Sequence, residues 1–420
     1  MKYVIVSTYE KQGGAAIAAL RLLNALLEAG VEAKMLVLYQ QSSFSEPIIP
    51  FQKSKFNNFK ALVFKAIEKL HFLRFQKNKN VRWLFTTAQY GFDLKEHELI
   101  QDANIINLHW IHHSFLSTAG IKDLLQLNKP VIWTLHDMWA FTGGCHYSGD
   151  CDHYLKNCGN CYQFLKHPSP TDLSNKIWRK KESVYQSNNL CITAPSNWLG
   201  NCARTSSLLQ SKEIFVIPNP IDTSKFKPTE NKISLRTKLS LPTDKVIIAF
   251  SAMKISDERK GMGILIEAMK HLQKENPTLF NTLFILAIGK NSDGLELPIN
   301  ILFSGFITDE NSIIEYYQSA DIFISPSLQD NLSNTVLEAM ACGLPAIVFD
   351  IGGMSDLVQN NVNGLLVQEI GSHKALATAI IEIQNNKIMF SENSRKLAVE
   401  KFSNQVIVTK LLSIPPLISL

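Results

Sequence analysis

Short apolar runs alternate with helical patterns along most of this chain, and this alternation limits the fold more than any other feature of the sequence. The runs are apolar throughout, as in strands whose two faces are both covered. Between the first two runs, apolar residues recur at the spacing of a helix, at Ala16, Leu20, Leu23 and Leu27, before Gly30 ends the pattern. Buried strands that alternate with helices predict a doubly wound parallel sheet.

The alternation occurs twice. We expect the strands of the first set at residues 3–7, 31–39, 104–109, 131–136, 190–195 and 214–218. The second set has expected strands at 246–252, 283–289, 301–304, 322–325 and 346–349, and expected helices at 263–273, 334–342 and 372–385. A chain of 420 residues is long enough for two domains, each with its own core. The sequence therefore predicts an α/β protein made of two doubly wound, Rossmann-like halves.

Charge and cysteine content narrow the class of protein. The 42 Lys and Arg residues exceed the 37 Asp and Glu residues by only 5, which does not predict nucleic-acid binding. No apolar run approaches the roughly 18 residues of a membrane-spanning helix, and the apolar start is too short for a signal peptide. Seven cysteines without an export signal do not indicate a disulfide framework. We expect a cytoplasmic enzyme.

One segment departs from the alternation. Residues 53–82 hold nine Lys and Arg residues and a single acid, Glu68, a local excess of 8 positive charges. The apolar residues between them follow roughly helical spacing: Phe56, Phe59, Val63, Ile67, Leu70 and Leu73. A basic amphipathic helix of this kind fits an anionic membrane surface, which would place the protein at the inner face of the plasma membrane. The other interpretation is a solvated helix that packs its Phe and Leu face onto the first domain.

Polar residues gather after the strand expected at 322–325. Asp330 and Asn331 lie in the loop that follows it, and Ser333 is a good N-cap for the next helix. Ligands of open α/β sheets bind at the carboxyl ends of strands, and the amides of residues 332–335 can hold a phosphate through the helix dipole. We expect Glu338 to accept hydrogen bonds from ribose hydroxyls and Asp330 to face the group attached to the phosphate.

This string resembles a known family. Residues 325–345, with Gly352 and Gly353 and the segment 363–367 after them, closely resemble the retaining glycosyltransferases of family 4, which have the GT-B fold. The first acid of that family's Glu-x7-Glu motif is Asp330 here, one methylene shorter. The resemblance covers nearly the whole chain. It implies two Rossmann-like domains that face each other across a cleft.

The resemblance also divides the chain into parts. It implies an N-terminal acceptor-binding domain at 1–215 and a C-terminal nucleotide-sugar-binding domain at 216–390. A C-terminal helix at 391–420 is expected to cross back to the first domain. The segment 219–222 resembles the family's Asn-Gly-Ile-Asp linker, with Pro220 in place of the glycine.

Three further motifs resemble parts of the family's site. Gly13 and Gly14 are similar to its N-terminal glycine loop at the cleft, and residues 133–137 to its Thr-Leu-His-Asp strand end, whose histidine, here His136, faces the donor sugar. Lys260, before Gly261, resembles the lysine that holds the donor diphosphate.

The family's arginine, about five residues before that lysine, is replaced by Ile255 in this chain. The resemblance therefore requires Lys254 or Arg259 as its substitute, and we favour Lys254 because it lies at a strand end.

The chemistry agrees with this assignment. Sugar transfer from a nucleoside diphosphate builds negative charge on the leaving phosphate, which fixed cations stabilise without a catalytic metal. The predicted catalytic residues are His136, Asp330 and Lys260, with His109 as a weaker candidate. The predicted donor-binding residues are Gly13, Gly14, Lys254, Arg259, Lys260, Asn331, Leu332, Ser333 and Glu338.

The resemblance implies a UDP- or GDP-sugar donor and retention without a separate nucleophile. The basic, Phe-rich segment 53–82 lies in the domain that binds the acceptor in this fold, so we expect a growing surface polysaccharide, with a lipid-linked oligosaccharide intermediate as the acceptor. Two other functions stay open. A soluble transferase acting on a small sugar or sugar phosphate would pack residues 53–82 as core. A non-catalytic nucleotide-sugar-binding protein would explain Asp330 and Ile255, although Lys260 and Glu338 are intact.

Four of the seven cysteines fall in the short segment 143–161. Cys145, Cys151, Cys158 and Cys161 follow the spacing C-x5-C-x6-C-x2-C. Four thiolates with a closing C-x2-C predict a structural zinc site, with His146 and His153 as alternative ligands. Reduced cysteines in a loop and an iron–sulfur cluster are the other interpretations. Because the loop follows His136, a metal there would brace the acceptor side and would not be catalytic.

Overall fold

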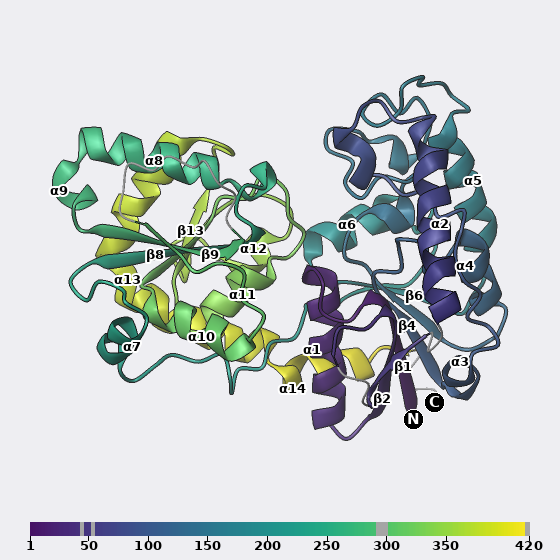
Figure 1. Cartoon of the computed structure of the whole chain (residues 1–420), viewed down its shortest axis with the longest axis horizontal. Helices are drawn as coiled ribbons and strands as arrows, with labels where there is room; N and C mark the ends of the chain where they lie inside the picture. Colours follow the sequence, from purple (N-terminus) through teal and green to yellow (C-terminus); the bar gives the residue numbers. More distant parts are fainter. Residues whose placement is uncertain (43–45, 52–54, 291–300, 416–420) are drawn as a thin grey trace. The chain divides into compact units, whose positions relative to one another are not determined.

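The computed structural model describes residues 1–42, 46–51, 55–290 and 301–415, and it divides into two compact units (Figure 1). Unit 1 is Met1–Pro218 together with the residues from Val408 onward, and unit 2 is Asn219–Ile407. Each unit has one parallel sheet with a hydrophobic core on each face. The prediction of two doubly wound α/β halves is confirmed.

The sheet of unit 1 has seven strands in the order β3-β2-β1-β4-β5-β6-β7, and every neighbouring pair is parallel. The strands are β1 (Lys2–Tyr9), β2 (Glu32–Tyr39), β3 (Ile48–Pro50), β4 (Ile105–Leu108), β5 (Val131–Thr134), β6 (Leu190–Ala194) and β7 (Ile214–Val216). Successive residues of β1 enter opposite cores: Tyr3 and Ile5 pack on one face, Val4 and Val6 on the other. This is why the sequence run is apolar at every position.

The helices of unit 1 cover both faces of this sheet. They are α1 (Gly14–Glu28), α2 (Lys55–Leu73), α3 (Glu98–Asp102), α4 (Thr118–Leu125), α5 (Leu173–Val184) and α6 (Asn197–Thr205), with short 3-10 turns η1 (Asn80–Trp83), η2 (Trp139–Phe141) and η3 (His153–Leu155). Within the described residues, no helix is both long and apolar enough to span a membrane.

The sheet of unit 2 has six parallel strands in the order β10-β9-β8-β11-β12-β13. They are β8 (Val246–Lys254), β9 (Leu283–Lys290), β10 (Ile301–Phe303), β11 (Ile322–Ser325), β12 (Ala346–Phe349) and β13 (Gly364–Val367). The helices are α7 (Lys232–Lys238), α8 (Met262–Glu275), α9 (Pro277–Phe280), α10 (Glu310–Ser319), α11 (Asn334–Ala341), α12 (Met354–Leu357) and α13 (His373–Phe402), with the 3-10 turn η4 (Glu258–Lys260) before α8. The last helix, α14 (Asn404–Leu412), begins in unit 2 and ends in unit 1.

The chain returns to unit 1 later than the segment 391–420 expected from the sequence. Residues up to Ile407 belong to unit 2, and from Val408 the chain packs in unit 1, where Val408 and Leu411 join the core of β1. Arg395 explains the difference, because its guanidinium donates hydrogen bonds to the backbone carbonyls of Phe226 and Ala341 in unit 2. The division between the units falls after Pro218, close to the expected division at 215.

Two strands were not expected from the sequence. β3 is three residues long, ends in Pro50 and lies at the sheet edge, so it carries almost no periodicity. β13 lies at the edge of the other sheet and begins at Gly364. Only glycine fits at this position, because a Cβ there would lie 2.1 Å from the carbonyl oxygen of Ala346.

Gly261 provides a test of this packing. It stands at a φ of +79° before α8, and a Cβ on it would lie 1.9 Å from the carbonyl oxygen of Pro326 in the loop after β11. We predict that Gly261→Ala lowers the stability of unit 2 by about 1–3 kcal/mol, measured as a lower midpoint in scanning calorimetry.

The matched control is Gly263→Ala two residues on. Its Cβ would meet nothing within 4 Å, and alanine favours the helix by up to about 1 kcal/mol. Equal midpoints for the two variants would contradict the prediction.

Candidate functional site

The loops after β8 and β11 form one structure at the carboxyl edge of the unit 2 sheet. From β8 the chain winds outward to β9 and β10, and β11 then pairs with the other side of β8, so the two loops diverge at the point where ligands of such sheets bind. The Leu328 amide donates to the Arg259 carbonyl oxygen at 2.8 Å, which ties the loops together.

Lys260 and Asp330 meet at this junction. The Lys260 Nζ lies 2.6 Å from the Asp330 Oδ2, although the residues come from different loops. The pair is only partly covered, with the lysine side chain 30% and the aspartate side chain 14% exposed. A second oxygen of Asp330 accepts a hydrogen bond from the Asn331 amide at 3.0 Å. The two predicted catalytic residues of unit 2 therefore act as one charged pair.

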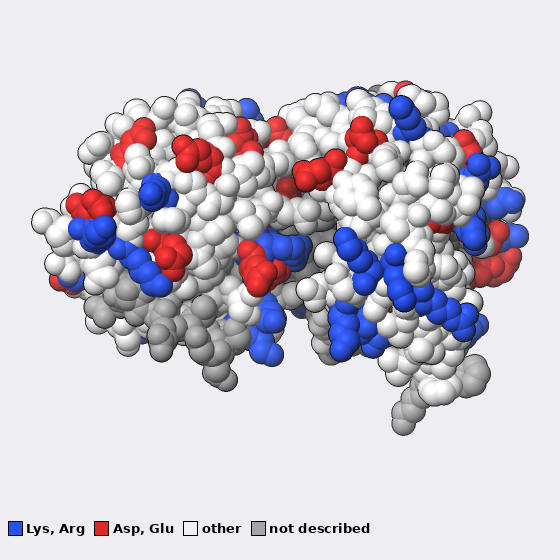
Figure 2. All heavy atoms as spheres, turned by 90° about the horizontal axis from the view of Figure 1, so that it is seen from above, with Lys and Arg blue, Asp and Glu red and all other residues white. Residues whose placement is uncertain are grey.

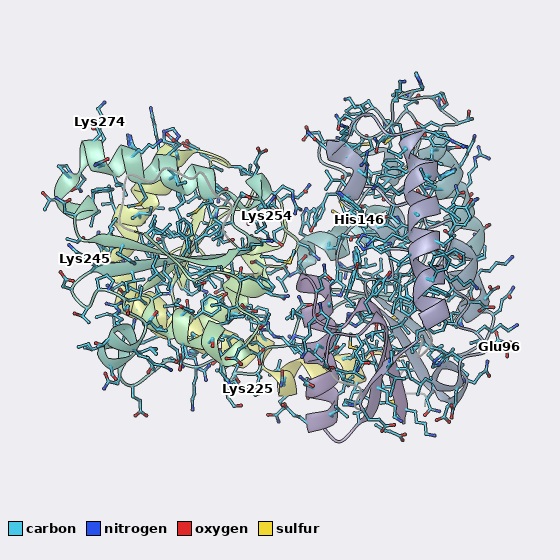
Figure 3. All side chains as sticks on the ribbon, viewed as in Figure 1. Glu96, His146, Lys225, Lys245, Lys254 and Lys274 are labelled. Atoms are coloured by element: carbon cyan, nitrogen blue, oxygen red, sulfur yellow. The ribbon has the colours of Figure 1, made fainter. Side chains whose placement is uncertain are left out.

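The two substitutes for the family's arginine differ in their surroundings. Arg259 is bound by its neighbour Asp257, with a 2.7 Å contact between Nη2 and Oδ2. Lys254, the exposed last residue of β8, forms no ion pair with any carboxylate in the described part of the chain (Figure 3). The geometry therefore favours Lys254 as the second cation.

The start of α11 offers backbone groups rather than side chains. Ser333 is its N-cap and accepts a hydrogen bond from the Val336 amide, as expected. The Leu332 side chain is buried in the core, so Leu332 can contact a ligand only through its backbone. The Asn331 carbonyl oxygen accepts from the Gly353 amide at 2.7 Å, which brings the Gly352-Gly353 segment to the same place.

Glu338 lies deeper than the sequence indicates. Its side chain is buried on α11, and its Oε2 accepts a hydrogen bond at 2.9 Å from the Tyr317 hydroxyl on α10. Burial raises the pKa of Tyr317 well above its usual value, so this hydroxyl keeps its proton and remains a donor. Tyr317 thus orients the carboxylate. Sequence reasoning missed it because a tyrosine in an amphipathic helix carries no distinctive signal.

In unit 1, the predicted glycines lie where α1 begins after β1: Gly13 precedes the helix and Gly14 is its first residue. Gly13 is the N-cap of α1 with a φ of +90°, a conformation that favours glycine. No side chain caps this helix end and no acid lies in its first turn. The helix dipole at this end is therefore not balanced by a side chain of its own helix.

His136 lies against His109 at the same edge. The two residues follow the neighbouring strands β5 and β4, and the His109 Nδ1 is 2.9 Å from the His136 Nε2. Burial lowers the pKa of His136 to about 4 and holds that of His109 well below its usual value, so both rings are neutral near pH 7. The pair can orient hydroxyl groups without adding charge.

A second polar cluster beside His136 was missed in the sequence. His146 Nδ1 contacts Asp137 Oδ2 at 2.7 Å, and its Nε2 contacts Thr86 Oγ1 at 2.9 Å. His112 completes the cluster, and His112, Asp137 and His146 are the one group in the described part of the chain whose metal-ligand atoms all lie within 4.8 Å. Since both nitrogens of His146 are occupied, the expectation that it is an alternative ligand of the cysteine site is not supported.

The four cysteines of the loop surround one small cavity. Cys145, Cys151, Cys158 and Cys161 all line it, together with His153, and its volume is about 20 Å³. Burial raises the pKa of Cys145, Cys158 and Cys161 to about 12, so they are neutral thiols unless a cation is bound. The thiols are spaced more widely than the ligand atoms of the histidine cluster.

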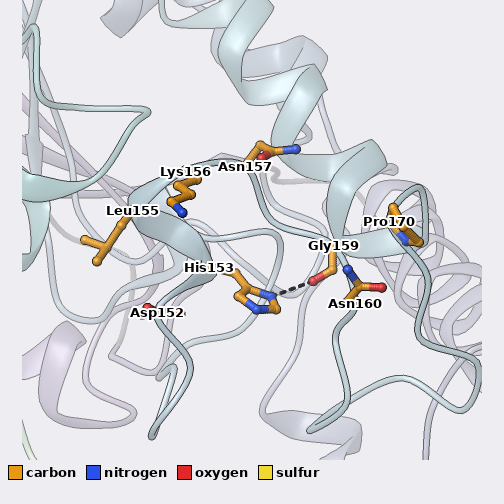
Figure 4. Close-up of a pocket in the computed structure, with 8 residues that line it drawn as sticks. All are labelled: Asp152, His153, Leu155, Lys156, Asn157, Gly159, Asn160 and Pro170. Atoms are coloured by element: carbon orange, nitrogen blue, oxygen red, sulfur yellow. Dashed lines mark hydrogen bonds between the residues drawn. The ribbon is translucent and has the colours of Figure 1, made fainter.

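A larger cavity of about 460 Å³ opens on the outer side of the same loop (Figure 4). Its lining residues are Asp152, His153, Leu155, Lys156, Asn157, Gly159, Asn160 and Pro170. His153 stands between the two cavities, and its Nδ1 donates to the Gly159 carbonyl oxygen at 2.7 Å. None of the predicted donor residues lines either cavity.

Two family models and a solved structure match this chain. The family model for glycosyltransferase family 4 matches residues 12–225, and that for glycosyl transferases group 1 matches residues 244–386. Among solved structures, Anabaena Alr3699/HepE in complex with UDP superimposes with a TM-score of 0.64 at 17% identity, covering all of both chains. At this identity the likeness shows the fold.

Curated relatives match parts of the chain. The Escherichia coli UDP-Gal:alpha-D-GlcNAc-diphosphoundecaprenol alpha-1,3-galactosyltransferase is 28% identical over 201 residues, 46% of this chain and 51% of that protein. The D-inositol 3-phosphate glycosyltransferase of Streptomyces bingchenggensis is 26% identical over 170 residues, 37% of each chain. The chain thus spans about half the length of the first relative and less of the second.

His136 and His113, two partly buried histidines of unit 1, predict how stability depends on pH. Burial holds the pKa of His136 and of His113 at about 4, whereas an exposed histidine titrates near 6.5. Between these pH values the two histidines bind protons in the unfolded chain but not in the native protein. The free energy of unfolding is therefore highest above pH 6.5 and falls as the pH decreases toward 4. Calorimetric midpoints measured across this range should fall accordingly.

The double variant His113→Gln with His136→Gln should show a shallower fall than the native chain. The exposed His167 provides the control, because His167→Gln leaves the buried edge intact. Parallel pH profiles for the native chain and the double variant would refute the assignment to these two rings.

Proposed function

The chain belongs to glycosyltransferase family 4, and from this membership we propose that it transfers a sugar from a nucleoside diphosphate sugar to an acceptor hydroxyl with retention of configuration. The observation that carries the proposal is the Lys260–Asp330 pair at the switch point of the unit 2 sheet. It sets a cation and a carboxylate side by side where a diphosphate and its sugar would bind. The UDP complex of the HepE neighbour and the UDP-Gal donor in the name of the Escherichia coli relative support a uridine nucleotide.

The charged residues of unit 2 have different roles in donor binding. Lys260 and Lys254 stabilise the negative charge that develops on the leaving diphosphate, and the amides at the start of α11 hold a phosphate. Asp330 keeps the Lys260 ammonium in place through the 2.6 Å contact. Glu338, oriented by Tyr317, accepts hydrogen bonds from the ribose.

The transfer itself needs no separate nucleophile. The bond between the anomeric carbon and the phosphate oxygen breaks, and a bond from the acceptor oxygen forms on the same face of the sugar. The leaving phosphate takes the acceptor's proton. The neutral His136–His109 pair orients sugar or acceptor hydroxyls, because a ring whose pKa is about 4 donates or accepts a hydrogen bond without a net charge at neutral pH.

The acceptor that we propose is lipid-linked, and the exposed face of α2 supports it. Phe59, Leu62 and Leu70 follow one another at helical spacing and are 63%, 60% and 61% exposed. The opposite face packs inward through Ala61 and Phe72. The helix thus has two apolar faces, of which only one is used by the fold. Its expected basic residue Lys53 lies outside the described residues, as do the side chains of Lys55 and Phe56.

Charge distribution makes this second face suited to an anionic membrane. Lys60 and Lys69 are exposed beside the apolar stripe. The segment's one acid, Glu68, is turned inward, where it accepts hydrogen bonds from the amides of Thr87 and Ala88 at 2.8 Å. Figure 2 shows a band of Lys and Arg side chains on unit 1. An apolar stripe between lysines is the pattern of a helix that lies in a membrane interface.

The second candidate is a transferase for a small sugar phosphate, as the name of the inositol 3-phosphate relative suggests. It requires no membrane contact. The exposed stripe of α2 favours the lipid-linked acceptor, and we propose that the protein works at the inner face of the plasma membrane.

Donor binding is tested by calorimetry with UDP, GDP, ADP and their sugar conjugates. One nucleotide should bind with a Kd of about 1 μM, near −8 kcal/mol. Lys260→Ala should weaken it by about 1.5–3 kcal/mol, because a charged hydrogen bond to the diphosphate is lost. Lys270→Ala is the control, since Lys270 lies exposed on α8 and pairs with Glu267. No binding by any nucleotide, or equal binding by both variants, would contradict the proposed donor site.

Membrane binding is tested by cosedimentation with phosphatidylglycerol vesicles. The double variant Leu62→Glu with Leu70→Glu should bind at least about 10-fold more weakly, because two leucines no longer enter the interface. Ile388→Glu is the control, as Ile388 on α13 is 76% exposed but lies outside the stripe. Vesicle binding that is absent in the native chain would favour the small-acceptor candidate and leave the donor test unaffected.

A further inference from the structure

The cysteine loop is held with very little core. Residues 142–172 connect η2 to α5, and apart from the turn η3 this fully described stretch contains no helix or strand. Its apolar support is one small cluster (Phe72, Val81, Phe85, Phe164, Leu165, Leu173 and Ile177) and the edge of the large core of unit 1, which Cys158 and Tyr154 reach. Long irregular connections in compact domains are uncommon, and small cores generally need a further constraint. The loop therefore calls for a fixing element besides apolar packing.

We propose that this loop binds one Zn²⁺ ion through the thiolates of Cys145, Cys151, Cys158 and Cys161. All four side chains line the same cavity of about 20 Å³. No three of their sulfur atoms all lie within 4.8 Å of one another, so binding would draw the thiolates together around the ion. That volume is the room of about one water-sized sphere, so it fits a single ion and not a cluster of several irons and sulfides. On binding, each thiol exchanges its proton for a bond to zinc, and solvent takes the protons.

Backbone geometry around Cys158 fits a sulfur that carries negative charge. The Gly143 amide donates a hydrogen bond to the Cys158 Sγ at 3.1 Å, as backbone amides commonly do toward the sulfur of a metal-bound thiolate. This approach requires glycine, because a Cβ on Gly143 would lie 2.7 Å from the Cys158 Cβ. The start of α5 holds the closing C-x2-C: Asn175 donates to the Cys158 carbonyl oxygen, and Asp172 accepts from the Cys161 amide at 2.8 Å.

A buried cation beside the loop has no carboxylate partner. Lys181 is fully buried, with its Nζ 3.3 Å from the centre of the Trp139 ring. It donates to the carbonyl oxygens of Trp139 and Thr142, at the point where the cysteine loop begins. It forms no salt bridge with any Asp or Glu of the described residues. Buried charges are normally paired, so this lysine indicates an anion nearby.

The zinc site supplies that anion. Four thiolates around Zn²⁺ leave an excess of two negative charges. Burial lowers the pKa of Lys181 to about 7, and negative charge on Cys158, Cys145 and Asp137 raises it. We therefore assign Lys181 as the counter-cation of the site. The ion would also fix His146, which the same loop carries to Asp137 beside His136.

Metal content of the full chain, purified without chelator, tests the ligands. Mass spectrometry should find about one zinc per chain in the native protein and none in Cys158→Ser or Cys161→Ser. Cys202→Ser is the control, because Cys202 lies on α6 outside the loop. A native protein without zinc, or with iron in its place, overturns the proposal. Zinc retained in Cys158→Ser but lost in His146→Gln would move the metal to the histidine cluster and overturn it too.

Spectroscopy of the native chain keeps the test independent of whether the serine variants fold. Replacement of zinc by Co²⁺ should give thiolate-to-cobalt charge-transfer bands and the visible bands of tetrahedral cobalt. Bands without thiolate character would overturn the four-cysteine assignment.

The role of Lys181 has its own test. In competition with a chelator, Lys181→Met should hold zinc about 10-fold or more weakly than the native chain, whereas the exposed neighbour Lys180→Met should not differ. Equal retention by both variants would remove Lys181 from the site. The measurement does not involve sugar transfer, so its failure would leave the proposed activity untouched.

Discussion

The contact between the loops after β8 and β11 is the constraint on which the donor site depends. Gly261 stands in the left-handed region with no room for a side chain against Pro326, and the Leu328 amide donates to Arg259 across the same junction. Because the strand order reverses at β8, these loops are the ones whose following elements diverge, which leaves their polar groups uncovered. Lys260 and Asp330 meet only because both loops are fixed there.

The parts of the fold that the sequence predicts are those whose signal is local. Buried parallel strands are apolar at every position, so β1 and β8 are recognised from a few residues each. The short edge strand β3, with Pro50 at its end, lacks this signal. The end of unit 2 depends on Arg395, whose bonds to Phe226 and Ala341 join residues far apart in sequence, and no spacing rule reports such contacts.

The site shows the same division. The motifs place Lys260, Asp330, Ser333 and Glu338 on the elements where the structure has them, but the motif does not indicate that Lys260 and Asp330 form an ion pair. Tyr317 and the pair of Asp137 and His146 are absent from the sequence prediction, because each acts through a partner on another element. Residues that bind a ligand can form a recognisable string, whereas residues that orient them are found only in three dimensions.

The shorter acid at position 330 has a structural explanation in these contacts. An aspartate that bonds both the Lys260 ammonium and the Asn331 amide is fixed at both oxygens before any ligand arrives. A glutamate has one more rotatable bond, whose freedom would be lost on forming the same two bonds. The shorter side chain therefore favours a rigid pair that positions the lysine, whereas a glutamate would extend farther toward the sugar. On this view Asp330 contributes to the donor site chiefly by holding Lys260, which fits a site where preorganised charge is the main catalytic term.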